Sequence, residues 1–134
     1  MEIESTFVML KPDSLRRGLI GEIISRIEKK GLKIADLKMK QLDTAFLNEH
    51  YAHIADKPFF FDILADMLSG PVIGMNVCGE NAVAGIRLLV GATKIEDAIP
   101  GTIRGDYALN TTKNLIHASD SVENGAIEIA RFFG

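Results

Sequence analysis

One histidine occupies a position where a reactive side chain is expected. His117 follows the apolar pair Leu115 and Ile116 and precedes Asp120, so it leaves a short strand just before a helix N-terminus. A neutral imidazole nitrogen is a competent nucleophile toward phosphorus, and it can act as the leaving group afterwards. The alternative is a structural histidine, which is the more common role for a histidine considered in isolation. His117 is therefore a candidate nucleophile whose role the rest of the sequence must decide.

Three basic residues are candidates for binding phosphate groups. Lys11, Arg87 and Arg104 lie at the ends of predicted elements or in a long loop, away from regular solvent-facing helix surfaces. Arginine binds phosphate oxygens through a planar pair of N–H donors, and lysine adds a compact charge. Ordinary surface charge is the alternative for each of them. The sequence contains no Walker-type glycine-rich motif that would decide between the two.

Phe59 is a candidate for stacking on a base. It is predicted to lie on the helix face that carries Asp62 and Asp66, which would leave its ring exposed. A partly buried packing role is the alternative. The hydroxyl groups of Tyr51 and Thr93 are hydrogen-bond donors near these segments, and neither is distinctive alone.

The remaining composition excludes several classes of protein. His50 and His53 lie in a polar stretch without metal-ligand spacing, so we expect both on the surface and predict no dedicated metal site. A net charge of −3 argues against broad attraction to nucleic acid. No apolar run approaches the roughly 18 residues of a membrane span, and the acidic N-terminus does not resemble a secretory signal. These features predict a cytoplasmic protein without membrane contact.

The elements that must position these side chains alternate between strands and helices. With 134 residues, of which 47% are apolar, the chain suits one domain spanning residues 1–134. Apolar periodicity and turn residues predict strands over 6–10, 34–42, 72–78 and 115–117, helices over 20–30, 58–69, 82–90 and 120–133, and a long loop over 92–113. A loop of that length inside a small domain is usually functional. The pattern alone leaves parallel and antiparallel pairing open.

Two details of this pattern are specific enough to check. Asp120 followed by Glu123 three residues later resembles a capping box at the start of the last helix. In the strand over 34–42, Leu37 and Met39 alternate with charged residues, which predicts an apolar face and a charged face.

Three segments together resemble the nucleoside diphosphate kinase family. They are Thr6 to Asp13 (TFVMLKPD), Pro100 to Asp106 (PGTIRGD) and Asn114 to Ser121 (NLIHASDS), and the similarity covers nearly the whole chain in the family's order. The resemblance implies an α+β (α/β) sandwich with a ferredoxin-like, four-stranded antiparallel sheet covered by helices. It also implies ping-pong transfer of the γ-phosphate from a nucleoside triphosphate, usually ATP, to a nucleoside diphosphate through phosphorylated His117.

The resemblance assigns roles to individual residues. Glu128 matches the carboxylate that orients the histidine, and Phe59 matches the base-stacking position. The positions that line the nucleotide's phosphates and ribose or the surroundings of the histidine are Lys11, Tyr51, Arg87, Thr93, Arg104 and Asn114. Mg²⁺ is expected to be bound with the nucleotide phosphates. The expected partners are nucleoside di- and triphosphates, with no specific nucleic acid, and a homo-oligomer built from dimers, either a tetramer or a hexamer.

Three departures from the family pattern bear on activity and assembly. Ala118 stands where a glycine is usual, and positive φ there would strain the turn after the histidine. Ser14 also replaces a common glycine, and Lys94-Ile95 replaces Asn-Pro in a loop used for subunit contacts. Ala118 motivates one rival hypothesis, a nucleotide-binding scaffold without catalysis. The other rival is an unrelated ferredoxin-like regulatory module in which His117 is incidental.

Overall fold

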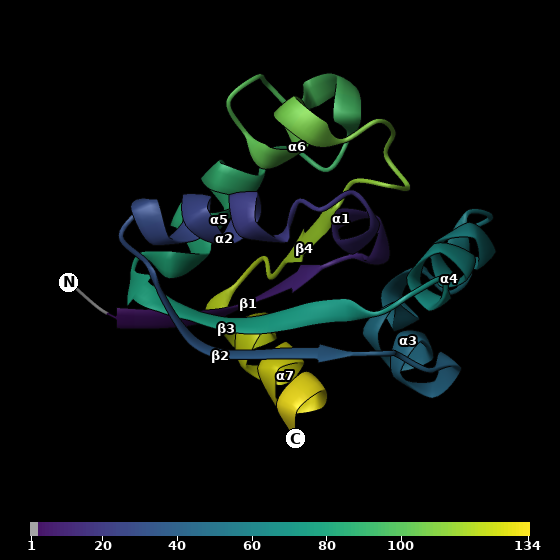
Figure 1. Ribbon diagram of the computed structural model, residues 1–134. Coiled ribbons are helices and arrows are strands. Elements are labelled where there is room, and N and C mark those ends of the chain that lie inside the picture. Colours follow the sequence, from purple (N-terminus) through teal and green to yellow (C-terminus); the bar gives the residue numbers. More distant parts are fainter. Residues whose placement is uncertain (1–2) are drawn as a thin grey trace.

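The centre of the protein is a four-stranded antiparallel sheet. The computed structural model describes residues 3–134. The strands are β1 (Ile3–Leu10), β2 (Lys33–Lys40), β3 (Val72–Glu80) and β4 (Ile116–Ala118), in the order β2-β3-β1-β4 (Figure 1). All three neighbouring pairs are antiparallel. The predicted ferredoxin-like α+β architecture is therefore confirmed, and the pairing that the sequence pattern left open is settled.

Seven α-helices connect and cover the strands within residues 3–134. They are α1 (Pro12–Arg16), α2 (Ile20–Lys29), α3 (Thr44–His50), α4 (Phe60–Leu68), α5 (Ala82–Val90), α6 (Ile103–Tyr107) and α7 (Val122–Phe133). Two 3-10 helices, η1 (Ala52–Ile54) and η2 (Ile95–Asp97), lie in the connections. None of the helices in the described part of the chain is long and apolar enough to cross a membrane.

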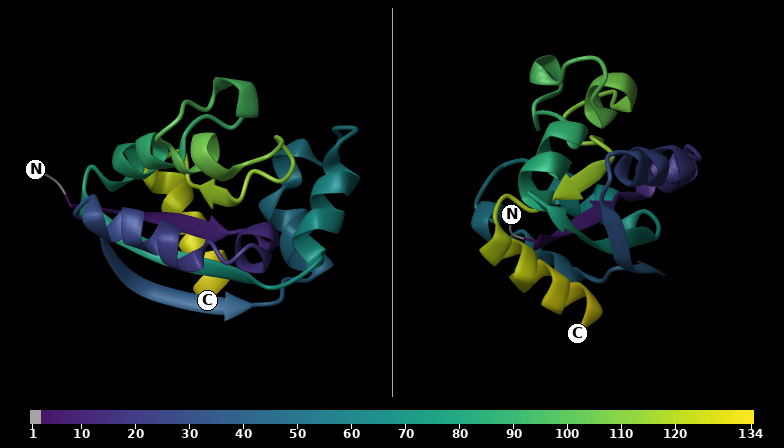
Figure 2. Two further views of the ribbon diagram at one scale, coloured as in Figure 1. Left: turned by 45° about the horizontal axis from the view of Figure 1, so that its top comes forward. Right: turned by 90° about the vertical axis from the view of Figure 1, so that its left-hand side faces the viewer.

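The sheet separates two hydrophobic cores. Helices α2 and α5 cover one face, where Ile23, Ile27 and Ile86 are fully buried. Helix α7 covers the other face, and α3 and α4 pack at one end of the sheet (Figure 2). In this second core Phe132 of α7 lies over β1 and β3, and it packs so closely on Gly74 that a Cβ there would come within 2.4 Å of its ring. The close packing fixes the position of α7 against β3 and against β1, the strand that pairs with β4.

Several predicted elements change in detail. Helix α5 has the predicted bounds, but α1 and α3 were not predicted, and the supposed loop over 92–113 contains η2 and α6. The predicted capping box is wrong by one residue: Ser121, not Asp120, is the N-cap of α7 and accepts a hydrogen bond from the backbone of Asn124 at 3.0 Å. Helix α4 begins at Phe60 rather than Pro58.

Strand β2 forms one edge of the sheet and is largely exposed. Its alternation is as predicted, with Leu37 opposite Met75 and Lys38 opposite Gly74. The apolar side chains are nevertheless 48% exposed at Leu37 and 54% exposed at Met39 in this single chain. An edge strand with exposed apolar side chains presents unpaired backbone groups and apolar surface together.

Candidate active site

Strand β4 and helix α7 bring His117 and Glu128 together. His117 is the central residue of β4, where it pairs with Met9 of β1. Its Nε2 lies 2.9 Å from Oε1 of Glu128. The Ser119 hydroxyl donates to the same carboxylate oxygen at 2.5 Å, and the Ser119 backbone N–H donates to the carbonyl of Phe7 at 3.1 Å. This arrangement holds the imidazole between a sheet strand and a helix.

The charge on Glu128 fixes the tautomer of His117. Burial of Glu128 opposes its ionisation, but the hydrogen bonds from His117 and Ser119 outweigh that effect and lower the pKa of the carboxyl group. An ionised carboxylate can only accept hydrogen bonds, so Nε2 of His117 must carry the proton. The lone pair on Nδ1 is then available as a nucleophile.

Lys11 is linked to the segment that leads into β4. Its backbone N–H donates to the carbonyl of Leu115 at 2.9 Å, and its Nζ donates to Oδ1 of Asn114 at 2.8 Å. Ser14 Oγ donates to the same Leu115 carbonyl at 2.5 Å. Burial and the nearby Arg104 lower the pKa of Lys11 to about 8, against a smaller opposing effect of Asp66. Lys11 is thus a largely buried cation tied directly to the strand of His117.

Two arginines contact the carbonyl groups around β4. Arg104 of α6 donates from Nη2 to the carbonyl of Ile116 at 2.5 Å and from Nη1 to the carbonyl of Gly91 at 3.1 Å. Burial and the nearby Arg87 lower the pKa of Arg104 to about 10. Arg87 of α5 donates to the carbonyl of Ala118 at 3.3 Å and is otherwise exposed. The predicted basic residues therefore do gather around the histidine strand.

Tyr51 and its neighbour His50 lie beside this cluster. Tyr51 is only 7% exposed, and its hydroxyl has no hydrogen-bond partner among the described residues. Burial, together with Asp66 and Glu128, raises the pKa of that hydroxyl. The prediction that His50 lies on the surface is wrong, because its ring is buried with its centroid 4.6 Å from that of His117. His53 is exposed, as predicted.

Phe59 and Thr93 lie away from these contacts. Phe59 precedes α4 and is 45% exposed, and Thr93 is exposed after α5. Asp66 was predicted to share the solvent-facing surface with Phe59, and this is wrong because it is 9% exposed, near Lys11 and Arg16. Neither Phe59 nor Thr93 makes a hydrogen bond or ring contact with the His117 cluster in the described part of the chain.

The similarity to known proteins covers almost the whole chain. The sequence profile described as "Nucleoside diphosphate kinase" matches residues 4–134. The chain belongs to the nucleoside diphosphate kinase family. It is 52% identical over 131 residues to the nucleoside diphosphate kinase of Acetivibrio thermocellus, covering 98% of this chain and 96% of that protein. The profile match and the sequence identity to this relative therefore agree on the family.

Solved structures of this family share the fold closely. The nucleoside diphosphate kinase of Encephalitozoon cuniculi superposes with a TM-score of 0.95 at 46% identity, covering 98% of this chain and 89% of that one. That of Halobacterium salinarum, determined in complex with CDP, gives a TM-score of 0.94 at 48% identity, covering 98% of this chain and 88% of that one.

The family departures at Ala118 and Ser14 are accommodated by the backbone. Among the described residues, Asn81 and Leu115 are the non-glycine residues with positive φ, so Ala118 carries no left-handed strain. It lies in β4 opposite Val8 and is 6% exposed. Ser14 contributes the hydrogen bond to the Leu115 carbonyl described above. The substitution at Ala118 therefore gives no reason to expect a kinase-family protein without catalysis.

Sequence reasoning missed three side chains of this kinase site. Ser119 stands inside the segment Asn114 to Ser121, two residues after His117 and just beyond the end of β4. His50 gave no sequence signal, because its burial arises from packing against β4 and α7. Arg131, whose Nη1 lies 3.3 Å from Nδ1 of His50, could have been linked to Glu128 by its spacing of three residues on one helix.

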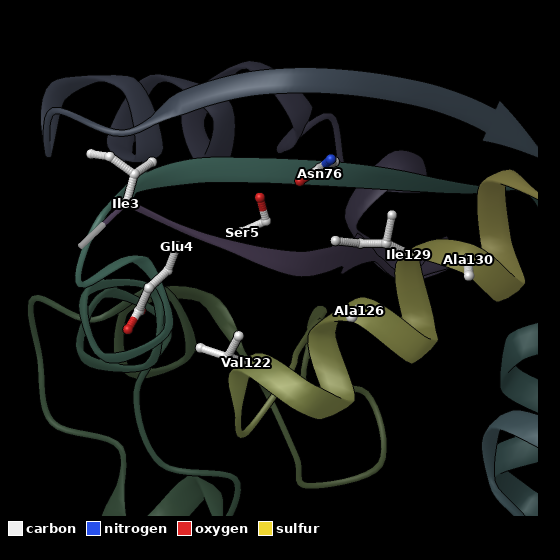
Figure 3. Close-up of a pocket in the computed structure, with 8 residues that line it drawn as sticks. All are labelled: Ile3, Glu4, Ser5, Asn76, Val122, Ala126, Ile129 and Ala130. Carbon is white, nitrogen blue, oxygen red and sulfur yellow. The ribbon is translucent and has the colours of Figure 1, made fainter.

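The His50, His117 and Glu128 ligand atoms all lie within 4.8 Å of one another, a spacing compatible with a metal ion. These atoms already have partners within the protein. Glu128 accepts hydrogen bonds from His117 and Ser119, and Nδ1 of His50 lies against the guanidinium group of Arg131. A separate groove lies elsewhere in the structure. It measures about 520 Å³ and lies between α7 and the strands at Ser5 and Asn76, where Figure 3 shows apolar side chains along its helix wall.

Proposed function

We propose that the chain transfers the terminal phosphate of a nucleoside triphosphate to a nucleoside diphosphate through a phosphorylated His117. The observation that carries this proposal is the hydrogen bond between Nε2 of His117 and Glu128, which leaves Nδ1 with its lone pair. In the first half-reaction Nδ1 attacks the γ-phosphorus. The bond from that phosphorus to the β-phosphate oxygen breaks, and the electron pair leaves with the nucleoside diphosphate.

The second half-reaction reverses these bond changes with a different acceptor. A β-phosphate oxygen of the incoming nucleoside diphosphate attacks the phosphorus, and the N–P bond breaks so that its electron pair returns to Nδ1. His117 carries positive charge while both its nitrogens are substituted, and the Glu128 carboxylate opposes that charge. One site then serves both nucleotides, which gives ping-pong kinetics.

The cations around β4 suit the phosphates of both nucleotides. Lys11, Arg87 and Arg104 supply positive charge from three different elements, and Asn114 holds Lys11 in place. We assign the Tyr51 hydroxyl, which has no partner among the described residues, and the Thr93 hydroxyl to the phosphates or ribose. Phe59 is exposed enough to stack on the base, and stacking reads no base edge, so broad nucleotide tolerance follows.

Mg²⁺ enters the proposed site with the nucleotide. The charged side chains around the His117 strand are the cations Lys11, Arg87 and Arg104 and the already hydrogen-bonded Glu128, so they fit the phosphate groups rather than a magnesium cage. The ion would be held by phosphate oxygens and water, and it would offset phosphate charge. A cytoplasmic location also stays a prediction.

We further propose a homo-oligomer built from dimers. The exposed edge strand β2, with Leu37 and Met39 on its surface, supports such an assembly, because apolar edge strands are seldom left uncovered. Light scattering coupled to size-exclusion chromatography gives the mass directly. A mass of one chain at micromolar concentration contradicts this part of the proposal.

The test of the reaction uses two of the three histidines of the chain. Wild type, His117→Ala and the matched control His53→Ala are incubated with γ-labelled ATP and Mg²⁺, then with GDP. Wild type and His53→Ala should take up acid-labile label and pass it to GDP, whereas His117→Ala should take up none. Acid-labile label on His117→Ala would show that another residue carries the phosphoryl group.

A further inference from the structure

His50 is a second buried imidazole in direct contact with His117. It lies in the last turn of α3, and its side chain is only 1% exposed. Its ring meets the ring of His117 at 76° with a centroid distance of 4.6 Å, and Phe46 stacks on it at 5.8 Å. The two groups that approach its Nδ1 both come from α7: Arg131 Nη1 at 3.3 Å and Glu128 Oε2 at 3.9 Å.

The guanidinium group of Arg131 decides the tautomer of His50. Arginine has only N–H donors and keeps its charge at all working pH values, so Nδ1 of His50 must accept the hydrogen bond. The proton of a neutral imidazole then lies on Nε2. The side chain of Arg131 is only 16% exposed, and its Nε lies 3.4 Å from Oε1 of the exposed Glu49 but makes no hydrogen bond among the described residues.

We propose that Arg131 is a positioning residue for the phosphoryl-transfer histidine, because it holds His50 as the neutral, Nε2-protonated imidazole and so reserves Glu128 for His117. The inference rests on the proposed role of His117. Arg131 follows Glu128 by three residues on α7, so both side chains project from one face of the helix toward the two imidazoles.

The competition that Arg131 prevents is a proton on Nδ1 of His50. A protonated His50 already lies at ion-pair distance from Glu128 Oε2, and an approach of only about 1 Å would form a charge-assisted hydrogen bond. It would then draw the carboxylate away from Nε2 of His117 and place a positive charge against the nucleophile. Loss of Arg131 removes both the hydrogen bond and the charge that disfavour this state.

The charged groups facing His50 come from every element packed around it. His117 lies on β4, Glu128 and Arg131 on α7, and Lys11 after β1. Burial, His117, Arg131 and Lys11 lower the pKa of His50, and Glu128 raises it. Removal of Arg131 therefore raises the pKa of His50, and the activity lost on acidification should be lost at higher pH.

The test compares pH profiles of kcat/KM for wild type, Arg131→Leu and Glu49→Gln. The acid limb of Arg131→Leu should move up by about 1 pH unit, with little change above pH 8, because a like charge near His50 has been removed. Glu49→Gln, which removes the exposed partner of Arg131, should leave the limb within about 0.3 unit of wild type. An unchanged limb in Arg131→Leu overturns the proposal.

A second background separates this role from a merely structural one. In His50→Gln no imidazole is present to titrate, so adding Arg131→Leu should produce no further shift of the acid limb. A shift that persists in the double variant overturns the proposal. Arg131→Lys, which keeps a charge and a donor, should keep the limb of wild type.

A direct readout does not depend on phosphoryl transfer or on the stability of any variant. In uniformly ¹⁵N-labelled wild type at pH 7, the two ring nitrogens of His50 should show an unprotonated Nδ1 and a protonated Nε2. A protonated Nδ1 overturns the inference even if His117 carries phosphate. The expected tautomer together with a protein that takes up no label on His117 would instead contradict the proposed function and leave the His50–Arg131 contact standing.

Discussion

Replacement of Glu128 by glutamine tests the charge of the carboxylate while keeping its shape. The glutamine oxygen can still accept from His117 Nε2 and from Ser119 Oγ, which lie 2.9 and 2.5 Å from the carboxylate oxygen. A hydrogen bond to a charged group contributes about 1.5–3 kcal/mol, against about 1 kcal/mol for a neutral one. The difference of about 0.5–2 kcal/mol should appear when His117 becomes positively charged, so kcat should fall about 2- to 30-fold.

The alanine variant removes the acceptor as well as the charge. Glu128→Ala leaves the His117 N–H and the Ser119 hydroxyl without this partner, so its kcat should fall about tenfold further than that of Glu128→Gln. Glu123→Gln, an exposed carboxyl in the first turn of the same helix, is the matched control and should have wild-type kcat.

The assay measures kcat with both nucleotides saturating, and thermal unfolding confirms that each variant is folded. Two results would refute the reasoning. A Glu128→Gln variant with the kcat of wild type would show that the carboxylate charge does not act on the transition state. An increase in KM at unchanged kcat would place Glu128 in nucleotide binding rather than beside the nucleophile.

Three stability predictions follow from individual contacts, each checked by unfolding experiments. Ser14→Ala loses the hydroxyl that donates to Leu115 and should lower the free energy of unfolding by about 1 kcal/mol; an unchanged value means that the bond contributes nothing net. Gly105→Ala places a Cβ 1.9 Å from a backbone carbonyl oxygen and should cost about 3 kcal/mol, whereas Gly21→Ala, with open space, should stabilise α2 by up to ~1 kcal/mol; equal effects of the two would refute the steric argument. His50 has its pKa lowered on folding, so its contribution is complete above its ordinary pKa of 6.5 and is lost as the pH falls below that value. His50→Gln should therefore lose stability less steeply than wild type on acidification below pH 6.5, by up to ~1.4 kcal/mol per pH unit, and parallel curves would show that His50 does not titrate in this way.

The sequence predicted the elements whose pattern is long and local. Helix α5 has the predicted bounds, and α2 ends before Gly31, whose φ of 100° is the left-handed stop that glycine permits. Helix α1, with five residues, is too short to show a period. Helix α3 starts at the N-cap Asp43, but its seven residues contain few apolar positions, so its stretch looked like polar surface.

The site divides in the same way between local and tertiary information. The roles of residues inside the segments that resemble the family, such as Lys11 and Asn114, could be predicted because the resemblance fixes their positions. His50 and Arg131 are 81 residues apart in sequence. The burial of His50 and its contact with Arg131 arise only when α3, β4 and α7 pack together. Strand and helix periodicity carries no information about such a contact, so the predicted surface position of His50 was wrong.

Leu115, the residue just before β4, has a left-handed backbone conformation that is strained but anchored by hydrogen bonds. Leu115 has φ of 77°, which costs a non-glycine residue roughly 1–2 kcal/mol. Its carbonyl accepts from the Lys11 backbone and from Ser14, two hydrogen bonds of about 1 kcal/mol each, so the strain and its anchors nearly balance. The turn at Leu115 also lies between Asn114, which accepts a hydrogen bond from Lys11 Nζ, and the strand of His117. Because one strained turn connects both groups, a shift of that turn would move the buried lysine and the histidine together, and the fully buried Leu115 side chain opposes such a shift.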